Sequence, residues 1–392
     1  MANLKVDTVS GIGTEGPVLN GGLHFRSKNY LTLPKGTTTE RIATSSGIST
    51  VIGAIRYNTD SNKMECYVNN KWMIVSTSSP NLDGGARGVF HSGRTASGTA
   101  KNNIDFITIE STGNAIDFGD STQLTEANNT SCVSSRTRGL YGGGYKHPTG
   151  HHDQIGFITI SSTGNSTDFG NLTQSRRGIL GVSNETRGVF CGGLSPTPRD
   201  TVDYVTIATT GDAVDFGDLN QARQSGTAMS SPTRGLLYGG YFHPSYAANE
   251  FITIATTGIS QEFGDAFRYI TNSLANRYNS AGISNSVRGL AAGGVYPSPD
   301  ATTGGIESYQ LASLGNGINF GDLLQTTRSK NGTASPVRGV FAGGTVGPSA
   351  STASATIDYV SMQTEGDAAD FGDLTQARYE HAPIGNAHGG LG

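Results

Sequence analysis

The chain has 392 residues, of which 56 are glycine, about twice the ordinary share, and 15% carry a charge. The net charge is −4 at pH 7 and no basic run occurs, which argues against nucleic acid as a partner because phosphate binding needs clustered Lys and Arg. No apolar stretch approaches the ~20 residues that cross a bilayer, so we expect no membrane insertion.

Residues 1–77 differ in pattern from the rest of the chain. Three alternating apolar segments at 53–60, 64–68 and 71–75 are separated by polar turn residues, which predicts a β-meander. Trp72, the only Trp of the chain, lies at the end of this pattern, where we expect it to pack a small core. A Gly- and Thr-rich segment of this size has little core of its own, so we expect it to self-associate.

From residue 78 onward one motif recurs: Arg-Gly, two or three apolar or small residues, then Gly-Gly. It begins at Arg138, Arg187, Arg234, Arg288 and Arg338, and a weaker copy at Arg87 has Ser92 in place of the first glycine. The intervals between these arginines are 51, 49, 47, 54 and 50 residues. A period near fifty with short apolar runs and paired glycines is typical of a β-propeller.

Each period contains three further strand candidates. An aromatic, β-branched run follows the glycine pair, as at 202–205; Asp-Phe-Gly comes next, as at 215–217; and a run of small residues, as at 226–229, leads into the next Arg-Gly. Four strands per period match one propeller blade. The small-residue strand suits the crowded position nearest the axis, where bulky side chains from every blade would overpack.

The number of small-residue strands indicates how the ring closes. The first Arg-Gly strand, at 87–93, has none before it, whereas the last Asp-Phe-Gly strand is followed by a spare one at 381–386. We expect this C-terminal strand to become the innermost strand of the first blade. The sequence therefore predicts an all-β chain: a small β-rich module at 1–77 and a six-bladed β-propeller at 78–392 closed by a C-terminal strand.

The order of glycine pair, aromatic strand, bulky aromatic and Leu-x-x-x-Arg resembles the kelch repeat, with the Phe of Asp-Phe-Gly where kelch has Trp. The likeness covers roughly residues 85–392. A closer resemblance is to kelch-like fibre proteins of tailed bacteriophages of the marine cyanobacterial type. These carry the same Thr-Arg-Gly-apolar-Gly-Gly and Asp-Phe-Gly-Asp-Leu-Thr-Gln-Ala-Arg motifs and end in His-Gly-Gly-Leu, as at 388–391. In residues 1–77, Arg-Tyr-Asn-x-Asp, Glu-x-Tyr and Trp look like the small module that joins shaft to head in many phage fibres.

The resemblance implies a non-enzymatic structural protein of the virion, assembled in the bacterial host cytoplasm, without a cofactor. The expected role is a tail fibre or adhesin that contacts a host surface polysaccharide or protein receptor. The N-terminal module is expected to bind other tail or capsid proteins and to form a homo-oligomer, by analogy a trimer. Three alternatives stay open: a head or collar fibre or decoration protein, a carbohydrate-active propeller enzyme, and a cellular kelch scaffold.

The loops after the glycine pairs vary most in sequence and are the candidate receptor-binding surface. Recognition residues concentrate on loops held by a rigid scaffold, and exposed Tyr suits stacking on sugars or anchoring in a partner's pocket. The candidates are Tyr145, His147, Tyr241, His243, Tyr246 and Tyr296. The competing interpretation, equally weighted, is that these residues brace their loops by packing on neighbours.

Other residue sets have structural interpretations. The repeated arginines could form a ring of cations, but an Arg at the same place in every blade more often ties neighbouring blades together through an Asp or a carbonyl. His147, His151 and His152 share one loop, but no second ligand cluster accompanies them except Asp153, so we expect no metal site. No Ser-His-Asp or Cys-His set is identifiable, so no catalytic residue is expected.

Overall fold

The computed structural model describes residues 33–41, 54–61, 63–68, 71–74, 86–122, 131–146, 149–242, 245–246, 248–267, 277–297, 300–346 and 352–391. The chain divides into two compact units, Met1–Ser79 and Pro80–Gly392. Regular structure in the described ranges is β, apart from one 3-10 turn, η2 (Gly389–Leu391). None of the described residues belongs to a helix long and apolar enough to cross a membrane.

The first unit contains a four-stranded sheet in the order β1 (Lys35–Gly36), β2 (Ile55–Asn58), β3 (Lys63–Val68) and β4 (Lys71–Ile74). Strands β2, β3 and β4 pair antiparallel, which is the expected meander, whereas β1 joins β2 in parallel. The Trp72 and Tyr67 rings lie 5.4 Å apart, so Trp72 packs within the sheet as expected. Glu65 is fully buried, and it accepts a hydrogen bond from Asn58 and pairs with Arg41.

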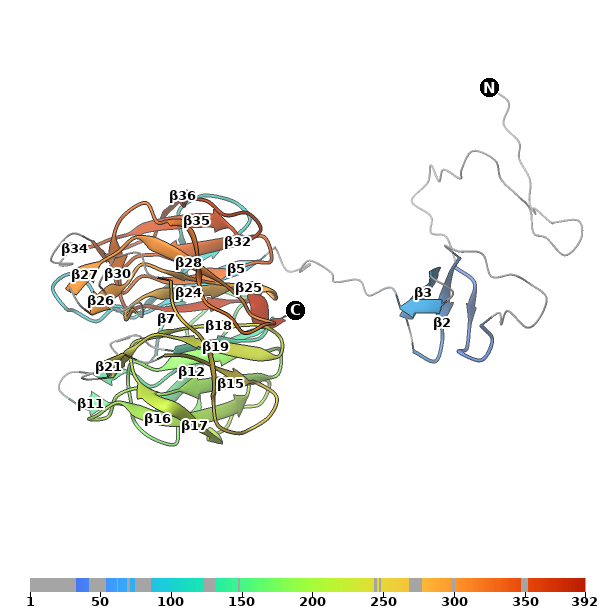
Figure 1. Ribbon diagram of the computed structural model, residues 1–392, viewed down its shortest axis with the longest axis horizontal. Helices are drawn as coiled ribbons and strands as arrows, with labels where there is room; N and C mark the ends of the chain where they lie inside the picture. The colour runs from blue at the N-terminus through green and yellow to red at the C-terminus, as the bar shows by residue number, and fades with distance from the viewer. Residues whose placement is uncertain are drawn as a thin grey trace, which may run out of the picture. The chain divides into compact units, whose positions relative to one another are not determined.

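The second unit contains six four-stranded antiparallel sheets, which we number 1 to 6 (Figure 1). In each, the order is the small-residue strand, the Arg-Gly strand, the aromatic strand and the Asp-Phe-Gly strand, called here the first to fourth strands. Sheet 1 is β37 (Ala382–Gly385), β5 (Arg87–His91), β6 (Asn103–Thr108) and β7 (Ile116–Asp120); sheet 2 is β8 (Ser131–Ser134), β9 (Arg138–Gly142), β12 (Gln154–Thr159) and β13 (Thr167–Asn171); sheet 3 is β14 (Leu180–Ser183), β15 (Arg187–Cys191), β16 (Arg199–Thr206) and β17 (Val214–Arg223). Sheet 4 is β18 (Thr227–Ser230), β19 (Arg234–Tyr238), β22 (Asn249–Thr253) and β23 (Gln261–Gly264); sheet 5 is β24 (Ala281–Ser284), β25 (Arg288–Ala292), β28 (Gly305–Gln310) and β29 (Ile318–Asp322); sheet 6 is β31 (Asn331–Ala334), β32 (Arg338–Ala342), β35 (Thr356–Ser361) and β36 (Ala369–Asp373).

Burial explains why these segments form these strands. Each second strand has a half-buried Arg followed by four buried residues, which is the pattern of a strand covered on both faces. In each fourth strand the Phe of Asp-Phe-Gly, or of its Glu and Asn variants, is buried while the two residues before it are exposed. The fourth strands are therefore edge strands that contribute one ring each to the core.

Neighbouring sheets are joined through their first strands, which lie side by side in the cyclic order β37, β8, β14, β18, β24, β31 and back to β37. The strand ends are aligned by serines: the Ser134 amide donates to Ser183 Oγ at 3.0 Å, and the Ser183 amide donates to Ser230 Oγ at 3.1 Å. Small side chains allow this approach, as the sequence predicts for a crowded centre.

The fourth strands are joined to the following sheet by a second cyclic set of contacts. A glycine in each turn between the third and fourth strands donates its amide to the carbonyl of the Asp-Phe-Gly phenylalanine, or its equivalent, one sheet earlier, at 2.8–3.1 Å. The donor and acceptor pairs are Gly164 and Phe118, Gly211 and Phe169, Gly258 and Phe216, Gly315 and Phe263, Gly366 and Phe320, and Gly113 and Phe371. A Cβ on the glycine after the Phe, for example Gly119, would overlap the carbonyl of Gly164. That position therefore requires glycine.

Sheet 1 takes its strands from both ends of the second unit. Strand β37 pairs antiparallel with β5, with Ala382 opposite His91 and Gly385 opposite Gly88. Asn386 Oδ1 accepts a hydrogen bond from the Arg87 amide at 2.7 Å, so the two chain segments meet as a hairpin turn would join them.

We predict that deleting residues 379–392 strongly destabilises the second unit, because sheet 1 then keeps three strands and exposes the edge of β5. Thermal unfolding should lose its cooperativity, or the protein should aggregate, in circular dichroism and light-scattering measurements.

A circular permutant is the matched control. If residues 379–386 are placed before Arg87 with two added residues, so that Asn386 begins a three-residue turn like 135–137, stability should return, because the same strand again pairs with β5. An unchanged melting curve for the deletion would mean that β37 contributes little.

Candidate functional site

The two ends of the six sheets carry different structures. The loops after the glycine pairs lie where the first strands begin, and several form small hairpins: β10 (Tyr145–Lys146) with β11 (Gly150–His151), β20 (Tyr241–Phe242) with β21 (Ser245–Tyr246), β26 (Val295–Pro297) with β27 (Asp300–Thr302), and β33 (Thr345–Val346) with β34 (Thr352–Ala353). In Figure 1 the labelled strands β11, β21, β26, β27 and β34 gather on the left of this unit, whereas the C-terminus emerges on the right. We call these the loop end and the tail end.

Both glycines of each Gly-Gly pair have positive φ, as at Gly143 (72°) and Gly144 (114°). Ser92, which replaces the first glycine in sheet 1, has φ 58°, so the turn is kept even there. The loops leave all six sheets through the same backbone geometry, which sets them on one end.

Two of the predicted receptor residues lie half-buried on the loop end, and both pack on other side chains. The Tyr145 ring meets the His151 ring edge-on at 5.5 Å and has the Arg177 guanidinium over it at 5.0 Å. The Tyr241 ring meets the Tyr278 ring at 5.9 Å. These contacts brace the loops and still leave part of each ring exposed.

Tyr296 was predicted to be an exposed receptor residue, and this is wrong. Its exposed fraction is 0%, and the Arg277 guanidinium lies 5.7 Å from the centre of its ring. The ion pair with Glu307 holds Arg277 in the core, so the Tyr296 ring that packs against this guanidinium is buried as well. For Tyr246 the structure describes only the backbone, in β21, and His147 and His243 lie outside the described residues.

The repeated arginines of the Arg-Gly motif bind carbonyl groups of the next sheet. In each case Nη1 donates to the residue after the third strand of the following sheet, at 3.0–3.5 Å. The donor and acceptor pairs are Arg87 and Ile160, Arg138 and Ile207, Arg187 and Ile254, Arg234 and Leu311, Arg288 and Met362, and Arg338 and Ile109. The last pair leads from sheet 6 back to sheet 1. Of the two predicted kinds of partner, an Asp or a carbonyl, the structure has the carbonyl.

Each of these guanidinium groups also lies over an aromatic ring of its own sheet, at 4.3–5.7 Å from the ring centre. In five sheets this ring belongs to a third-strand residue. The same ring packs edge-on against the Phe of Asp-Phe-Gly or of its Glu variant. In sheet 5 Ser308 occupies that third-strand position opposite Leu290, and Arg288 lies over Phe320 of the fourth strand instead. These arginines are therefore structural links between sheets.

A second series of cations is fully buried and was not predicted from the sequence. Each comes from the segment before a first strand and pairs with an acid on the third strand of the same sheet, at 2.5–3.0 Å. The pairs are Arg176 with Asp203, Arg223 with Glu250, Arg277 with Glu307, Lys330 with Asp358, and Arg378 with Asp105. Burial lowers the pKa of Lys330 and raises the pKa of Asp358, so burial opposes the charged form of both partners of this pair.

Sheet 2 lacks this pair, and it lacks both partners together. Gly156 stands at the position of the acid, and the sequence has no Lys or Arg between Lys101 and Arg136. The Tyr141 hydroxyl fills the space beside Gly156 and donates to Ser166 Oγ at 2.8 Å. Loss of the acid and the cation in the same sheet indicates that each is retained for the other.

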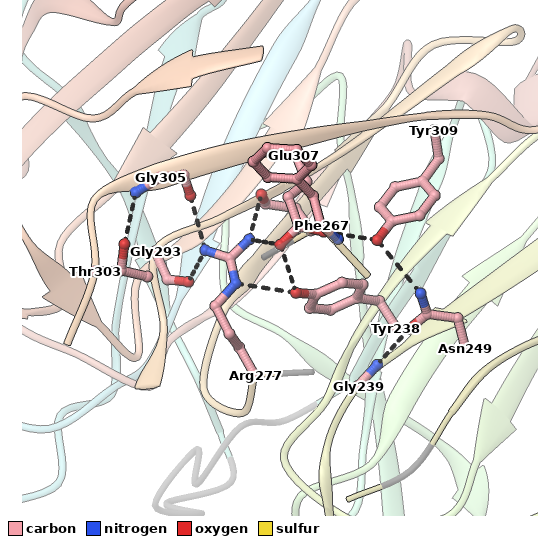
Figure 2. Close-up of polar contacts among 11 residues, drawn as sticks. Tyr238, Gly239, Asn249, Phe267, Arg277, Gly293, Thr303, Gly305, Glu307 and Tyr309 are labelled. Atoms are coloured by element: carbon pink, nitrogen blue, oxygen red, sulfur yellow. Dashed lines mark hydrogen bonds and ion pairs between the residues drawn. The ribbon is translucent and has the colours of Figure 1, made fainter. Parts of the chain in front are cut away.

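The most extensive of these networks joins sheets 4 and 5 (Figure 2). Arg277 donates to Glu307 at 2.6 Å, to the Tyr238 hydroxyl at 2.9 Å and to three backbone carbonyls. The Tyr309 hydroxyl donates to Glu307 at 2.7 Å and accepts from Asn249. Burial raises the pKa of both tyrosines well above the ordinary value, so they stay protonated. The cluster has no access to solvent, and its chemistry is structural.

We predict that Arg176→Met lowers the free energy of unfolding by about 3–5 kcal/mol, because Asp203 is then a buried charge without its cation. The double variant Arg176→Met/Asp203→Asn should regain part of the loss, since the amide oxygen can still accept from Thr173. The midpoints of urea unfolding measure both. A double variant that is no more stable than Arg176→Met would contradict the pairing argument.

The first strands surround a cavity of about 100 Å³, and the C-terminal tail contacts three of these strands. His388 lines it, and its Nε2 donates to the Ser134 carbonyl at 3.0 Å while Nδ1 accepts from the Gly390 amide at 3.1 Å. A Cβ on Gly390 would overlap the Ser183 carbonyl, so only glycine fits there. Residues 388–391, which lie beyond the last predicted strand, thus pack against the first strands of sheets 3, 4 and 5.

Sheet 1 contains two buried histidines, His91 and His381. His91 stacks on Tyr141 with ring centres 3.7 Å apart, and His381 Nε2 lies 2.9 Å from the Ala342 carbonyl. Burial, followed by the nearby Arg378, lowers the pKa of each imidazole to about 3. In the unfolded chain both would take up protons near pH 6.5.

We predict that stability falls as the pH drops from 6.5 toward 3, because only the unfolded state binds these two protons in that window. The slope approaches about 2.7 kcal/mol per pH unit for two imidazoles. In His91→Ala/His381→Ser, which uses residues found at the equivalent positions of other sheets, the slope between pH 6.5 and 4.5 should flatten. An equal slope in both proteins would assign the acid sensitivity elsewhere.

No protein-family model and no curated protein sequence matches this chain. Among the described residues, no group of three or more His, Cys, Asp or Glu side chains is arranged to hold a metal ion. His151 and His152 are engaged with Tyr145 and Thr149, respectively.

Proposed function

We propose that residues 80–392 form a closed six-bladed β-propeller of the kelch-like type, in which each four-stranded sheet is one blade. The observation that supports this is the cyclic order of three independent contacts: first strand to first strand, turn glycine to Phe carbonyl, and Arg-Gly arginine to carbonyl. Each set leads from sheet 6 to sheet 1, as only a closed ring requires.

We further propose that the protein is a non-enzymatic component of a bacteriophage virion, a tail fibre or adhesin that contacts a host surface receptor. The resemblance of the repeats and of residues 1–77 to phage fibre proteins carries this proposal. The first unit would then join the protein to other virion proteins and assemble it as a homo-oligomer, and the loop end of the second unit would face the host.

The chemistry of the second unit supports binding over catalysis. Its five buried acids are held in ion pairs at 0–3% side-chain exposure, away from any substrate. The loop end instead offers partly exposed rings on a frame fixed by interlocking backbone contacts, which is the usual division between scaffold and recognition surface.

We predict that Tyr145→Ala/Tyr241→Ala weakens adsorption of the protein to host cells much more than it lowers the melting temperature. A stacked ring in a binding site contributes on the order of 1–2 kcal/mol, whereas a half-exposed loop residue contributes less to folding. Ile116→Ala/Val214→Ala, two exposed residues at other edges, is the control. Normal adsorption at unchanged stability would move the binding surface away from these rings.

A further inference from the structure

The loop end contains a polar cavity of about 350 Å³ that none of the predicted receptor residues lines. Its walls come from sheets 5, 6 and 1: Ala96, Asn279, Arg328, Ser329, Thr345, Tyr379 and Glu380. Sites for small molecules commonly enclose ~300–1,000 Å³, so this volume suits a ligand of one or two sugar rings. Six of these seven residues carry side chains that can form hydrogen bonds.

Three of these residues share an unusual backbone conformation. Asn279, Ser329 and Glu380 have φ of 54°, 54° and 56°, and Ser225 of sheet 4 has 56° at the same repeat position. The backbone amide of each residue donates to the backbone carbonyl of its counterpart one sheet earlier, at 2.7–3.1 Å: Asn279 to Ser225, Ser329 to Asn279, and Glu380 to Ser329. This chain of bonds holds the non-glycine residues in a left-handed conformation that side chains ordinarily avoid.

Glycine would serve the fold equally well at this position. Sheet 3 has Gly178 there with φ 65°, and its carbonyl accepts from the Ser225 amide at 2.9 Å in the same chain of bonds. Polar side chains at the equivalent positions of sheets 4, 5, 6 and 1 are therefore not explained by backbone geometry, and those of sheets 5, 6 and 1 line the cavity. Such strained positions concentrate at ligand sites.

Among the residues that the structure describes, one cation at the cavity has no acidic partner. Arg94 pairs with Glu380 at 3.5 Å and also lies over the Tyr379 ring at 6.0 Å, which neutralises that acid. Arg328 is half-buried, and its guanidinium has no hydrogen bond or ion pair with any residue that the structure describes. Gln224 and Tyr278 stand at its repeat position in sheets 4 and 5, so the fold does not demand an Arg there.

We propose that this cavity binds an acidic sugar residue, a hexuronic acid unit of a surface polysaccharide. The Arg328 guanidinium would pair with the sugar carboxylate, Asn279 and Ser329 would bond its hydroxyls, and Tyr379 would contact the ring face. This rests on the proposed adhesive function and gives it a ligand class, because an unmatched cation among hydroxyl and amide groups selects an anionic polyol over a neutral one.

The test is titration of the full-length protein with glucuronic acid, glucose and acetate, followed by NMR or calorimetry. Glucuronic acid should bind at least tenfold more tightly than glucose or acetate, since only it offers both the carboxylate and the hydroxyls. Arg328→Gln should weaken the binding of glucuronic acid about tenfold or more, whereas Arg199→Gln should leave this binding unchanged. Arg199 is the control because it lies on the same end of sheet 3 with its guanidinium already bonded to the Ser195 carbonyl.

Ser329→Gly separates binding from folding. Glycine relieves the left-handed backbone and removes the hydroxyl, so the melting temperature should be unchanged or higher while glucuronic acid affinity falls. Equal binding of glucose and glucuronic acid, or full affinity in Arg328→Gln, would overturn the acidic-sugar site, as would the absence of sugar binding by the folded protein. If Arg328→Gln still adsorbs to host cells, the cavity is not the contact point, but the proposed adhesive function stands. If the unaltered protein does not adsorb to host cells, the adhesive function itself is wrong.

Discussion

The hydrogen bond from each turn glycine to the Phe carbonyl of the preceding sheet is the contact on which the second unit depends. A four-stranded sheet alone has an open fourth strand, and an open edge invites pairing with other chains. The turn of the next sheet covers that edge, but only if the backbones approach closely. The glycine of Asp-Phe-Gly makes the approach possible, because a Cβ there would overlap the incoming turn. One missing side chain per period therefore decides whether neighbouring sheets can pack edge to turn.

The buried ion pairs solve a different problem. Five of the six sheets keep a cation and an acid in the core, although moving such charges out of water costs several kcal/mol per ion. Each cation belongs to the segment that connects two sheets, and it pairs with an acid on the third strand of the sheet that follows. The pair therefore fixes the connecting segment to that sheet. In sheet 6 the position of the buried arginine is occupied by Thr327. Lys330, three residues later, supplies the cation that pairs with Asp358 instead. A cation supplied from a new position indicates that the charge pair itself, and not one particular side chain, is what these five sheets have in common.

Repetition made much of this structure predictable. The period near fifty residues, the four strand types and the spare strand at 381–386 follow from counting, because identical local sequences meet identical neighbours. The acceptor of Arg138 could be narrowed only to an Asp or a carbonyl, since the choice depends on the adjacent sheet. The burial of Tyr296 was missed because a loop position does not reveal that Arg277 will draw the ring inward. The ion pairs could have been found in the sequence, because the second period lacks both partners. Gly156 stands where the other periods have an acid, and no Lys or Arg occurs between Lys101 and Arg136.

Repetition also separates the positions that serve the fold from those that serve something else. Where all six periods agree, as at the Arg-Gly dipeptide that opens each second strand, one physical requirement is repeated six times. At the left-handed position before each first strand, the described sheets contain Gly178, Ser225, Asn279, Ser329 and Glu380, although glycine satisfies the backbone. A fold that tolerates glycine gains no stability from serine, asparagine or glutamate held at positive φ. Stability of the fold therefore does not explain this variation, and three of the four polar residues, those of sheets 5, 6 and 1, line the proposed sugar site.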